Sequence, residues 1–179
     1  LLSLEAAHGS TTASPAILLR RIAVHPRGQY VAEASNGTLL GAVYTCRRAS
    51  LEALAAQPSE LHTPSGTVLL LLGVVQRIGA AVADAMRRHV LNLASLDHTI
   101  VCVAACCPYA PPLDRACNGV HRSTLLFHTC AGANVVDAAD SCQRPGTASL
   151  GDALVFRYAL REINLLTDQH FSGVAACVD

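Results

Sequence analysis

The stretch GTVLLLLGVVQRIGAA, residues 66–81, decides the fold of this chain. Its first ten residues form an apolar run of strand length, and small residues then lead into a helical pattern that extends to about Leu96. A helix that begins just after a strand points unpaired backbone N–H groups outward, and its dipole adds positive potential there. The stretch therefore predicts either a pyrophosphate-binding junction or an ordinary strand-to-helix turn packed with small residues.

The composition is that of a globular protein with one core of ordinary size. The chain has 179 residues, of which 51% are apolar and 15% are charged. The 13 basic residues balance the 13 acidic ones, so no strong field attracts nucleic acid or an anionic membrane. All the basic residues are arginine, which excludes a catalytic lysine. We expect one domain over residues 1–160, with an incomplete N-terminus, and a tail or the start of a linker over residues 161–179.

The sequence shows no targeting or membrane segment. The longest apolar run, residues 68–75, is much shorter than the ~20 residues that cross a bilayer. No positively charged segment followed by an apolar one opens the chain, which begins with Leu1 and which we expect to be a fragment. The expected location is the cytoplasm or the interior of an organelle.

The eight cysteines favour neither a metal site nor a disulfide framework. No two form a Cys-x-x-Cys pair, so we predict no metal, and a chain with a core of this size does not need disulfides. Cys102, Cys106 and Cys107 lie in or just after one apolar stretch, where thiols act as small hydrophobic side chains. We expect reduced thiols.

Caps and turn residues predict the remaining elements. Ser14-Pro15 starts a helix that Pro26 ends, and residues 35–37 form a hairpin turn, with Gly41 marking a bulge in the strand that follows. The expected order is helix 15–24, strands 29–34, 38–46 and 66–75, helix 79–96, strand 99–106, a loop over 108–119, helix 121–131, and strands 135–138 and 152–160. This order predicts an α/β or α+β protein with a mixed central sheet flanked by helices.

The helix expected over residues 79–96 has an apolar face. Arg87 and Arg88 fall outside it, and we interpret them as part of a solvated surface rather than as a docking site for a partner. The residues that we expect to be buried recur at helical spacing: Val82, Ala85, Met86, Val90 and Leu93.

Residues 76–81 also resemble the hallmark of the GNAT superfamily, the acyl-CoA N-acetyltransferases. That hallmark is Gln/Arg-x-x-Gly-x-Gly/Ala at a strand-to-helix junction, and Gln76, Gly79 and Ala81 match it. The flanks resemble one branch more specifically: the GNAT-like domain at the start of polyketide synthase loading modules, and a similar domain in the multidomain starter protein of saxitoxin biosynthesis. The matching segments, which span residues 2–160, are LSLEAA (2–7), HPRGQYVAE (25–33), LLGAVYT (39–45), Phe127-His128, Gly132-Ala133 and Arg144-Pro145.

The resemblance implies a GNAT fold and an acyl-thioester substrate. Members of the branch decarboxylate malonyl or methylmalonyl groups carried on coenzyme A or on an acyl carrier protein, and some transfer the product to the carrier thiol. The implied cofactor is a malonyl-, methylmalonyl- or acetyl-CoA thioester or phosphopantetheine, and the implied partner is an acyl carrier protein domain. The implied catalytic residues are His128 and Arg144, and the implied cofactor-binding residues are Val74, Gln76, Arg77, Ile78, Gly79, Ala80 and Ala81.

Two positions depart from this branch. Its active-site threonine falls on Ala104, and its pocket tryptophan falls on Gly9, in a chain that has no tryptophan. Loss of one such hydroxyl donor typically lowers a rate by about 10²–10³. The hydroxyl or thiol groups that can replace it are those of Thr129, Ser123 and Cys106.

Three hypotheses stay open after this comparison. The chain is a decarboxylating or acyl-transferring domain, a degraded domain that only binds thioesters, or an amine N-acetyltransferase. The third needs a general base, and no acidic residue stands at a convincing position for one. Each site residue also has a structural interpretation: His128 covers a helix edge, and Arg144 is a solvated loop arginine.

Overall fold

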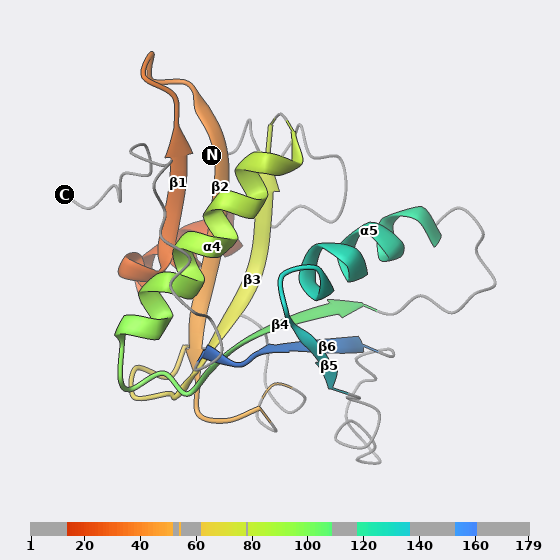
Figure 1. Cartoon of the computed structure of the whole chain (residues 1–179). Helices are drawn as coiled ribbons and strands as arrows, with labels where there is room; N and C mark the ends of the chain where they lie inside the picture. The colour runs from red at the N-terminus through yellow and green to blue at the C-terminus, as the bar shows by residue number, and fades with distance from the viewer. Residues whose placement is uncertain are drawn as a thin grey trace.

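The computed structural model describes residues 14–51, 54, 62–77, 79–108, 118–136 and 153–160. They form a six-stranded sheet with helices on both faces (Figure 1). The helices are α2 (Pro15–Val24), α4 (Ala80–Leu96), α5 (Asn118–Thr129) and the short 3-10 helix η1 (Pro26–Gly28). The strands are β1 (Gln29–Glu33), β2 (Leu39–Arg48), β3 (Val68–Gln76), β4 (Cys102–Pro108), β5 (Asn134–Val136) and β6 (Ala153–Tyr158). Within these residues no helix combines the length and the hydropathy that crossing a membrane requires.

The sheet is mixed, as predicted. Its strand order is β1-β2-β3-β4-β6-β5. β3 and β4 are parallel, and the other neighbouring strands are antiparallel. The parallel pair follows from α4, because a helical crossover carries the chain back to the end of the sheet at which β3 began, so β4 runs in the same direction.

Local signals fix α2 and the first hairpin where the sequence predicts them. Ser14 caps α2 by accepting a hydrogen bond from the backbone N–H of Ile17 at 3.4 Å, and Pro26 follows the end of the helix. Gly37 lies in the hairpin turn with φ of +80°, a left-handed conformation that glycine adopts without strain. The expected bulge is also present, since Leu40, beside Gly41, is an extra residue in β2.

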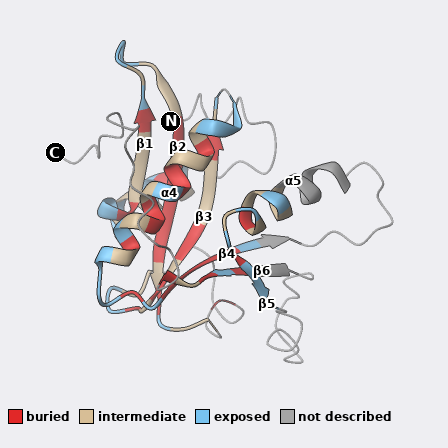
Figure 2. Ribbon diagram, in the orientation of Figure 1, coloured by how far each residue is buried: buried red, intermediate tan, exposed pale blue. Residues whose placement is uncertain are grey.

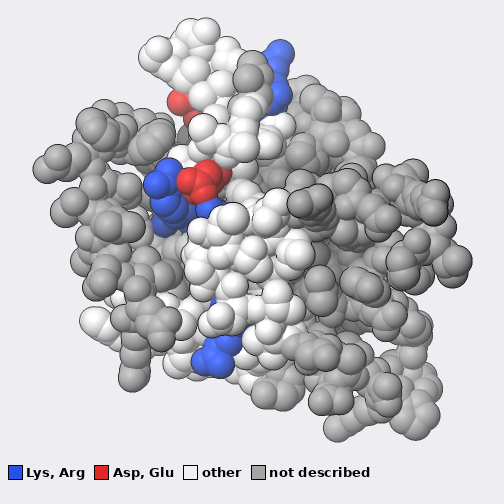
Figure 3. Space-filling view, turned by 45° about the vertical axis from the view of Figure 1, so that its right-hand side comes forward, with Lys and Arg blue, Asp and Glu red and all other residues white. Residues whose placement is uncertain are grey.

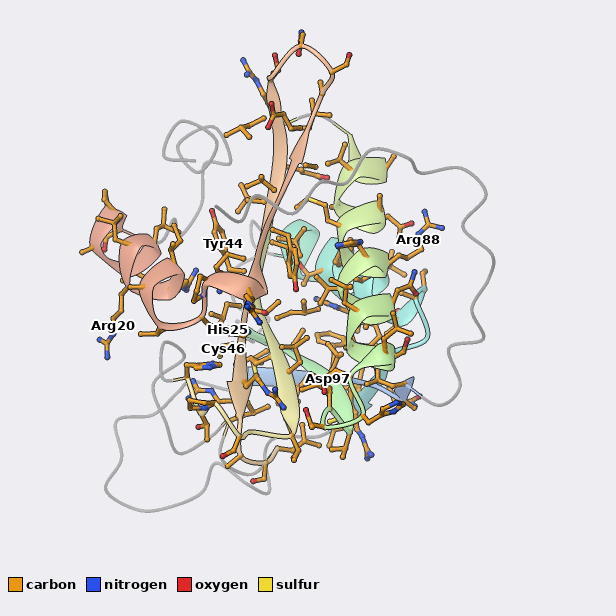
Figure 4. All side chains as sticks on the ribbon, turned by 90° about the vertical axis from the view of Figure 1, so that its left-hand side faces the viewer. Arg20, His25, Tyr44, Cys46, Arg88 and Asp97 are labelled. Carbon is orange, nitrogen blue, oxygen red and sulfur yellow. The ribbon has the colours of Figure 1, made fainter. Side chains whose placement is uncertain are left out.

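Apolar clusters lie on both faces of the sheet, and Figure 2 shows buried residues along the strands and on α4. Figure 4 shows α2 on one side of the sheet and α4 on the other. On the α2 face, Leu18 belongs to a cluster with residues of β2 and β3. On the α4 face the helix packs against several strands, and the buried cluster there includes Val43, Leu71, Met86, Val90, Leu91, Val103, Phe156 and Tyr158.

The buried face of α4 differs from the predicted one. Leu93 is 37% exposed and Ala85 is only half-buried, so the expectation for these two was wrong, whereas Val82 is half-buried and packs against the core cluster. The helix is turned toward a different stripe, because the residues it buries are Ala83, Met86, Arg87, Val90, Leu91 and Ala94. The solvated-surface interpretation is therefore wrong for Arg87, which is 4% exposed, and right for Arg88.

Two further expectations are corrected. α5 begins at Asn118 rather than at His121, and Pro108 belongs to β4, so the predicted loop over residues 108–119 was too long at both ends. Cys102 is buried, but Cys106 is exposed, so it does not act as a core side chain. Among the described cysteines, those at positions 46, 102, 106 and 130 are not in disulfide bonds.

Candidate functional site

β3 and β4 separate in the middle of the sheet, as Figure 1 shows. They pair only from Val68 opposite Cys102 to Leu71 opposite Ala105. β3 then continues beside β2 alone, and β4 continues beside β6 alone, among the strands described. The backbone groups on the two facing edges have no strand partner in this part of the chain, so a ligand between the strands can bind them. We call this divergence the fork.

A bulge in β3 lies where the fork opens. Tyr44 and Thr45 of β2 pair with Gly73 and Leu71 of β3, so Leu72 is an extra residue. An extra residue bends its strand and increases the local twist, and such bulges are common beside active sites. The bulge therefore gives a local reason why β3 leaves β4 directly after Leu71.

At the junction between β3 and α4, the backbone N–H groups of Val82 and Ala83 bond to the Gly79 carbonyl and to the Gln76 side chain, so the helical amides that can face an anion are those of Ala80 and Ala81. Gly79 precedes the helix with φ of +70°, and it carries no side chain to cap those amides. Ala80 and Ala81 are exposed, and the exposed side chain of Arg77 adds a positive charge nearby. Backbone N–H groups, the helix dipole and a cation together suit an anion.

The other residues predicted to bind the cofactor have mixed surroundings. The side-chain oxygen of Gln76 accepts a hydrogen bond from the backbone N–H of Ala83 at 3.3 Å, so Gln76 partly caps α4. Val74 lies on the segment of β3 beyond the fork and is half-buried against the α4-side cluster. Ile78 lies outside the described residues.

His128 is buried between α5 and β6. It is 5% exposed, and its Nδ1 lies 2.6 Å from the hydroxyl oxygen of Tyr158. Its ring stacks on Phe156 with centroids 4.6 Å apart. The interpretation of His128 as a residue covering a helix edge does not describe these contacts, because both partners come from a distant strand.

The register of the sheet puts His128 at the fork. Phe156, on which its ring stacks, pairs with Ala105 of β4. Ala105 in turn pairs with Leu71, the last residue of β3 before the two strands separate. His128 therefore lies on the α4 face at the level where a ligand entering the fork reaches the paired part of the sheet.

Arg87 is the charged neighbour of this histidine. Its guanidinium donates hydrogen bonds to the backbone carbonyl of Phe127 and to Asp84, and it lies 4.1 Å from the centroid of the Phe127 ring. Burial and then the positive charge of Arg87 lower the pKa of His128 from 6.5 to about 4. His128 is consequently a neutral imidazole at physiological pH.

Ala104 does not lie beside His128. It is fully buried and belongs to a cluster with Val68, Leu70 and Cys102. Its neighbours Val103 and Ala105 belong to the α4-side cluster, and because successive side chains of a strand point to opposite faces, Ala104 points away from His128. A threonine here would place its hydroxyl among apolar side chains on the other face.

In the described part of the site, no side chain predicted to replace the threonine hydroxyl is placed to do so. The Thr129 hydroxyl donates to the carbonyl of Leu125 within its own helix at 2.9 Å. Cys106 lies just beyond the paired part of β4 and is exposed. The side chain of Ser123, like Arg144 and Gly9, lies outside the described residues, so their roles remain predictions from the resemblance.

Sequence reasoning missed Arg87, Phe156 and Tyr158, although signals for all three exist. Arg87 follows Ala83 by one helical turn and so continues the buried stripe of α4. Phe156 and Tyr158 alternate along β6 and therefore share one face. The helical spacing of Arg87 was given less weight than the general tendency of arginine side chains to be exposed, so Arg87 was predicted to lie on the surface.

The charged side chains of the described residues do not gather into a patch on the face that Figure 3 presents. Figure 3 shows that charged side chains are sparse on the face it presents, and that both signs lie next to each other. An example is Arg88, which pairs with Asp84 at 2.8 Å. In the described residues no group of three or more histidine, cysteine or acidic side chains is placed to hold a metal ion.

Comparisons with known proteins found matches among solved structures only. No model of a protein family matches the chain, and no curated protein matches it. Among solved structures it is similar to the GphF GNAT-like decarboxylase in complex with isobutyryl-CoA, with a TM-score of 0.68, 29% identity, and coverage of 89% of this chain and 92% of that one. It is also similar to the loading GNATL domain of CurA from Lyngbya majuscula, with a TM-score of 0.67, 22% identity, and coverage of 89% and 91%.

A third solved structure shares the same architecture at lower similarity. Naa20 from Chaetomium thermophilum, in complex with a bisubstrate analogue, has a TM-score of 0.58 and 17% identity over 89% of this chain and 82% of that one. At this identity the likeness concerns the fold alone. The mixed sheet, the fork, the junction before α4 and these similarities together show that the chain has the GNAT fold.

Proposed function

We propose that this chain is an acyl-thioester domain that decarboxylates a malonyl or methylmalonyl group. The group is carried on coenzyme A or on an acyl carrier protein, and the domain passes the acyl product to a carrier thiol. The observation that supports this most is the neutral, buried side chain of His128 at the fork. The chain that carries it is 29% identical to a GNAT-like decarboxylase. The proposed cofactor site is Val74 with residues 76–81, and Arg144 is the proposed second catalytic residue.

The chemistry explains why a neutral histidine suits this reaction. When the bond between the α-carbon and the carboxylate breaks, carbon dioxide leaves and its electron pair forms the enolate of the thioester. A nearby N–H group that donates to the enolate oxygen stabilises that charge as it develops. A proton is then added to the α-carbon, which restores the thioester.

Amine acetylation is the second candidate, and the described residues favour it less. That reaction needs a base that accepts the ammonium proton. The acidic side chain of Asp84, which contacts the His128 neighbour Arg87, is paired with Arg87 and Arg88. A degraded domain is the third candidate, and it predicts thioester binding without turnover.

One experiment separates the three. The chain is incubated with malonyl-CoA, with methylmalonyl-CoA, and with acetyl-CoA plus a panel of amines and peptide N-termini, and products are identified by mass spectrometry. We expect acetyl-CoA or propionyl-CoA from the first two. His128→Gln should lower the yield of these products strongly, and His98→Gln, at an exposed histidine beyond α4, is the matched control. Acylated amine would favour the second candidate, and binding without product would favour the third.

Carrier transfer and pathway need their own tests. We propose an acyl carrier protein domain as the partner, in polyketide-type biosynthesis and in saxitoxin biosynthesis as one such pathway, inside the cytoplasm or an organelle. Intact mass spectrometry of a phosphopantetheinylated carrier protein after incubation would detect the transferred acyl group. Neighbouring ketosynthase, methyltransferase or carrier domains in the parent reading frame would support the pathway, and their absence would count against it.

A further inference from the structure

Tyr158 and His128 form a buried pair that links β6 to α5. Tyr158 is 1% exposed and His128 is 5% exposed, and 2.6 Å separates the Tyr158 hydroxyl oxygen from Nδ1 of the histidine. A contact of this length between two buried polar atoms is a hydrogen bond, because leaving either group unpaired away from water is costly. The pair therefore constrains where the imidazole carries its proton.

A neutral imidazole has one proton, on Nδ1 or on Nε2. If the tyrosine hydroxyl donates, Nδ1 is the acceptor and Nε2 carries the proton; if Nδ1 donates, Nε2 is left with a lone pair. A hydrogen bond at one ring nitrogen thus decides what the other nitrogen can do. A phenol is a better donor than an imidazole N–H, which favours the first arrangement.

We propose that Tyr158 is a positioning residue whose hydroxyl donates to Nδ1 of His128 and so holds the imidazole proton on Nε2. The inference rests on the proposed function for its consequence. With the proton on Nε2, His128 can donate to an enolate oxygen and cannot accept the proton of an amine. The Tyr158–His128 pair therefore selects decarboxylation over amine acetylation at the same fork.

Three elements hold the ring in this orientation. β6 contributes the Phe156 stack and the Tyr158 hydroxyl. α5 carries the histidine, and α4 fixes the preceding peptide through the hydrogen bond from Arg87 to the Phe127 carbonyl. Burial and then the cation of Arg87 lower the pKa of His128, so the neutral form of the ring persists across the physiological range.

Nitrogen NMR of the uniformly ¹⁵N-labelled full chain tests this pair without any turnover. The chain has eight histidines, and the His128→Gln variant identifies the signals of His128 by their loss. We expect the protonated nitrogen of His128 to be Nε2. In Tyr158→Phe we expect both tautomers to be populated, whereas Tyr30→Phe, a matched change at a tyrosine that contacts His89, should leave the His128 signals unchanged.

The kinetic readout follows from the same pair. By the scale of other residues that orient a catalytic imidazole, Tyr158→Phe should lower kcat for malonyl-CoA by about 10–100-fold, with KM unchanged. Tyr30→Phe should change neither constant. A proton on Nδ1 of His128 in the wild-type chain would overturn the proposal. Unchanged His128 signals in Tyr158→Phe would overturn it too.

The proposed decarboxylation and the proposed role of Tyr158 can be contradicted independently of each other. Nε2 protonation without any decarboxylation would contradict the proposed function and leave the pair in place. Decarboxylation by a chain whose His128 is protonated on Nδ1 would contradict the pair and leave the function in place.

Discussion

His128 and His25 are two histidines whose pKa is lowered from 6.5 to about 4, and they differ in what surrounds them. At His25 the causes are burial, then the ring of His62, stacked with centroids 4.2 Å apart, and then Arg47. At His128 the causes are burial and then Arg87, and a tyrosine hydroxyl contacts the ring nitrogen.

The His25 region has structural contacts that explain it fully. The backbone N–H of His25 donates to the carbonyl of Arg21 and so ends α2, and Figure 4 shows His25 on the α2 side of the sheet. Nδ1 of His62 accepts the backbone N–H of Arg47 at 3.1 Å. A lowered pKa therefore does not identify a functional histidine by itself, and the position of His128 at the fork makes the distinction.

The largest expected effect separates the two histidines by activity. Because His128 is the proposed donor to the enolate oxygen, His128→Gln should lower the rate of malonyl-CoA decarboxylation by about 10²–10³. His25→Gln should leave that rate unchanged. The measurement is release of carbon dioxide under saturating substrate, with circular dichroism to confirm folding. An equal loss of decarboxylation rate in both variants would contradict a catalytic role specific to His128.

The next effect concerns stability and pH, and both regions contribute. Above pH 6.5 both histidines are neutral in the folded and the unfolded chain. As the pH falls from 6.5 toward 4, the unfolded chain binds protons that the folded chain excludes, so the free energy of unfolding decreases. For His128 the loss is at most about 3 kcal/mol, and it is smaller for the more exposed His25.

Urea unfolding at several pH values measures this loss. In His128→Gln or His25→Gln the decrease between pH 6.5 and 4 should be shallower than in the wild-type chain. A free energy of unfolding that stays constant over this range would contradict both lowered pKa values.

Replacing the arginine near each histidine should have a smaller effect, on the pKa of that histidine. Arg87→Met should raise the pKa of His128 and leave that of His25 unchanged, and Arg47→Met should do the reverse. Loss of the Arg87 hydrogen bond to the Phe127 carbonyl should also cost about 1–3 kcal/mol of stability. Histidine titration followed by NMR reads each pKa in both variants. A shift of both histidines by one variant would show that the regions are coupled.

The smallest expected effect tests the position of the missing threonine. Ala104→Thr adds a hydroxyl among apolar side chains on the face away from His128, so it should cost about 1–2 kcal/mol in stability. It should not raise the decarboxylation rate. A gain of tenfold or more would show that a hydroxyl at this position reaches the reacting group.

Elements governed by neighbouring residues were the ones that sequence predicted well. The Ser14 cap, the Gly37 turn and the change from apolar strand to helix at residues 75–80 depend on conformational preferences within a few positions. The stripe that α4 buries was predicted less well, since it depends on which strands lie beneath it. Arg87 shows this most clearly, because its burial is stabilised by an acceptor 40 residues away.

The sequence alone determined the order of the elements, the strand-to-helix junction before α4 and the position of His128 in a Phe-His motif. Only the tertiary structure decided that β3 and β4 part after Leu71, that Ala104 faces away from His128, and that Tyr158 contacts its ring. The reason is physical. Caps, turns and periodicity act between residues close in the chain, whereas strand register and buried hydrogen bonds join residues whose separation no local pattern encodes.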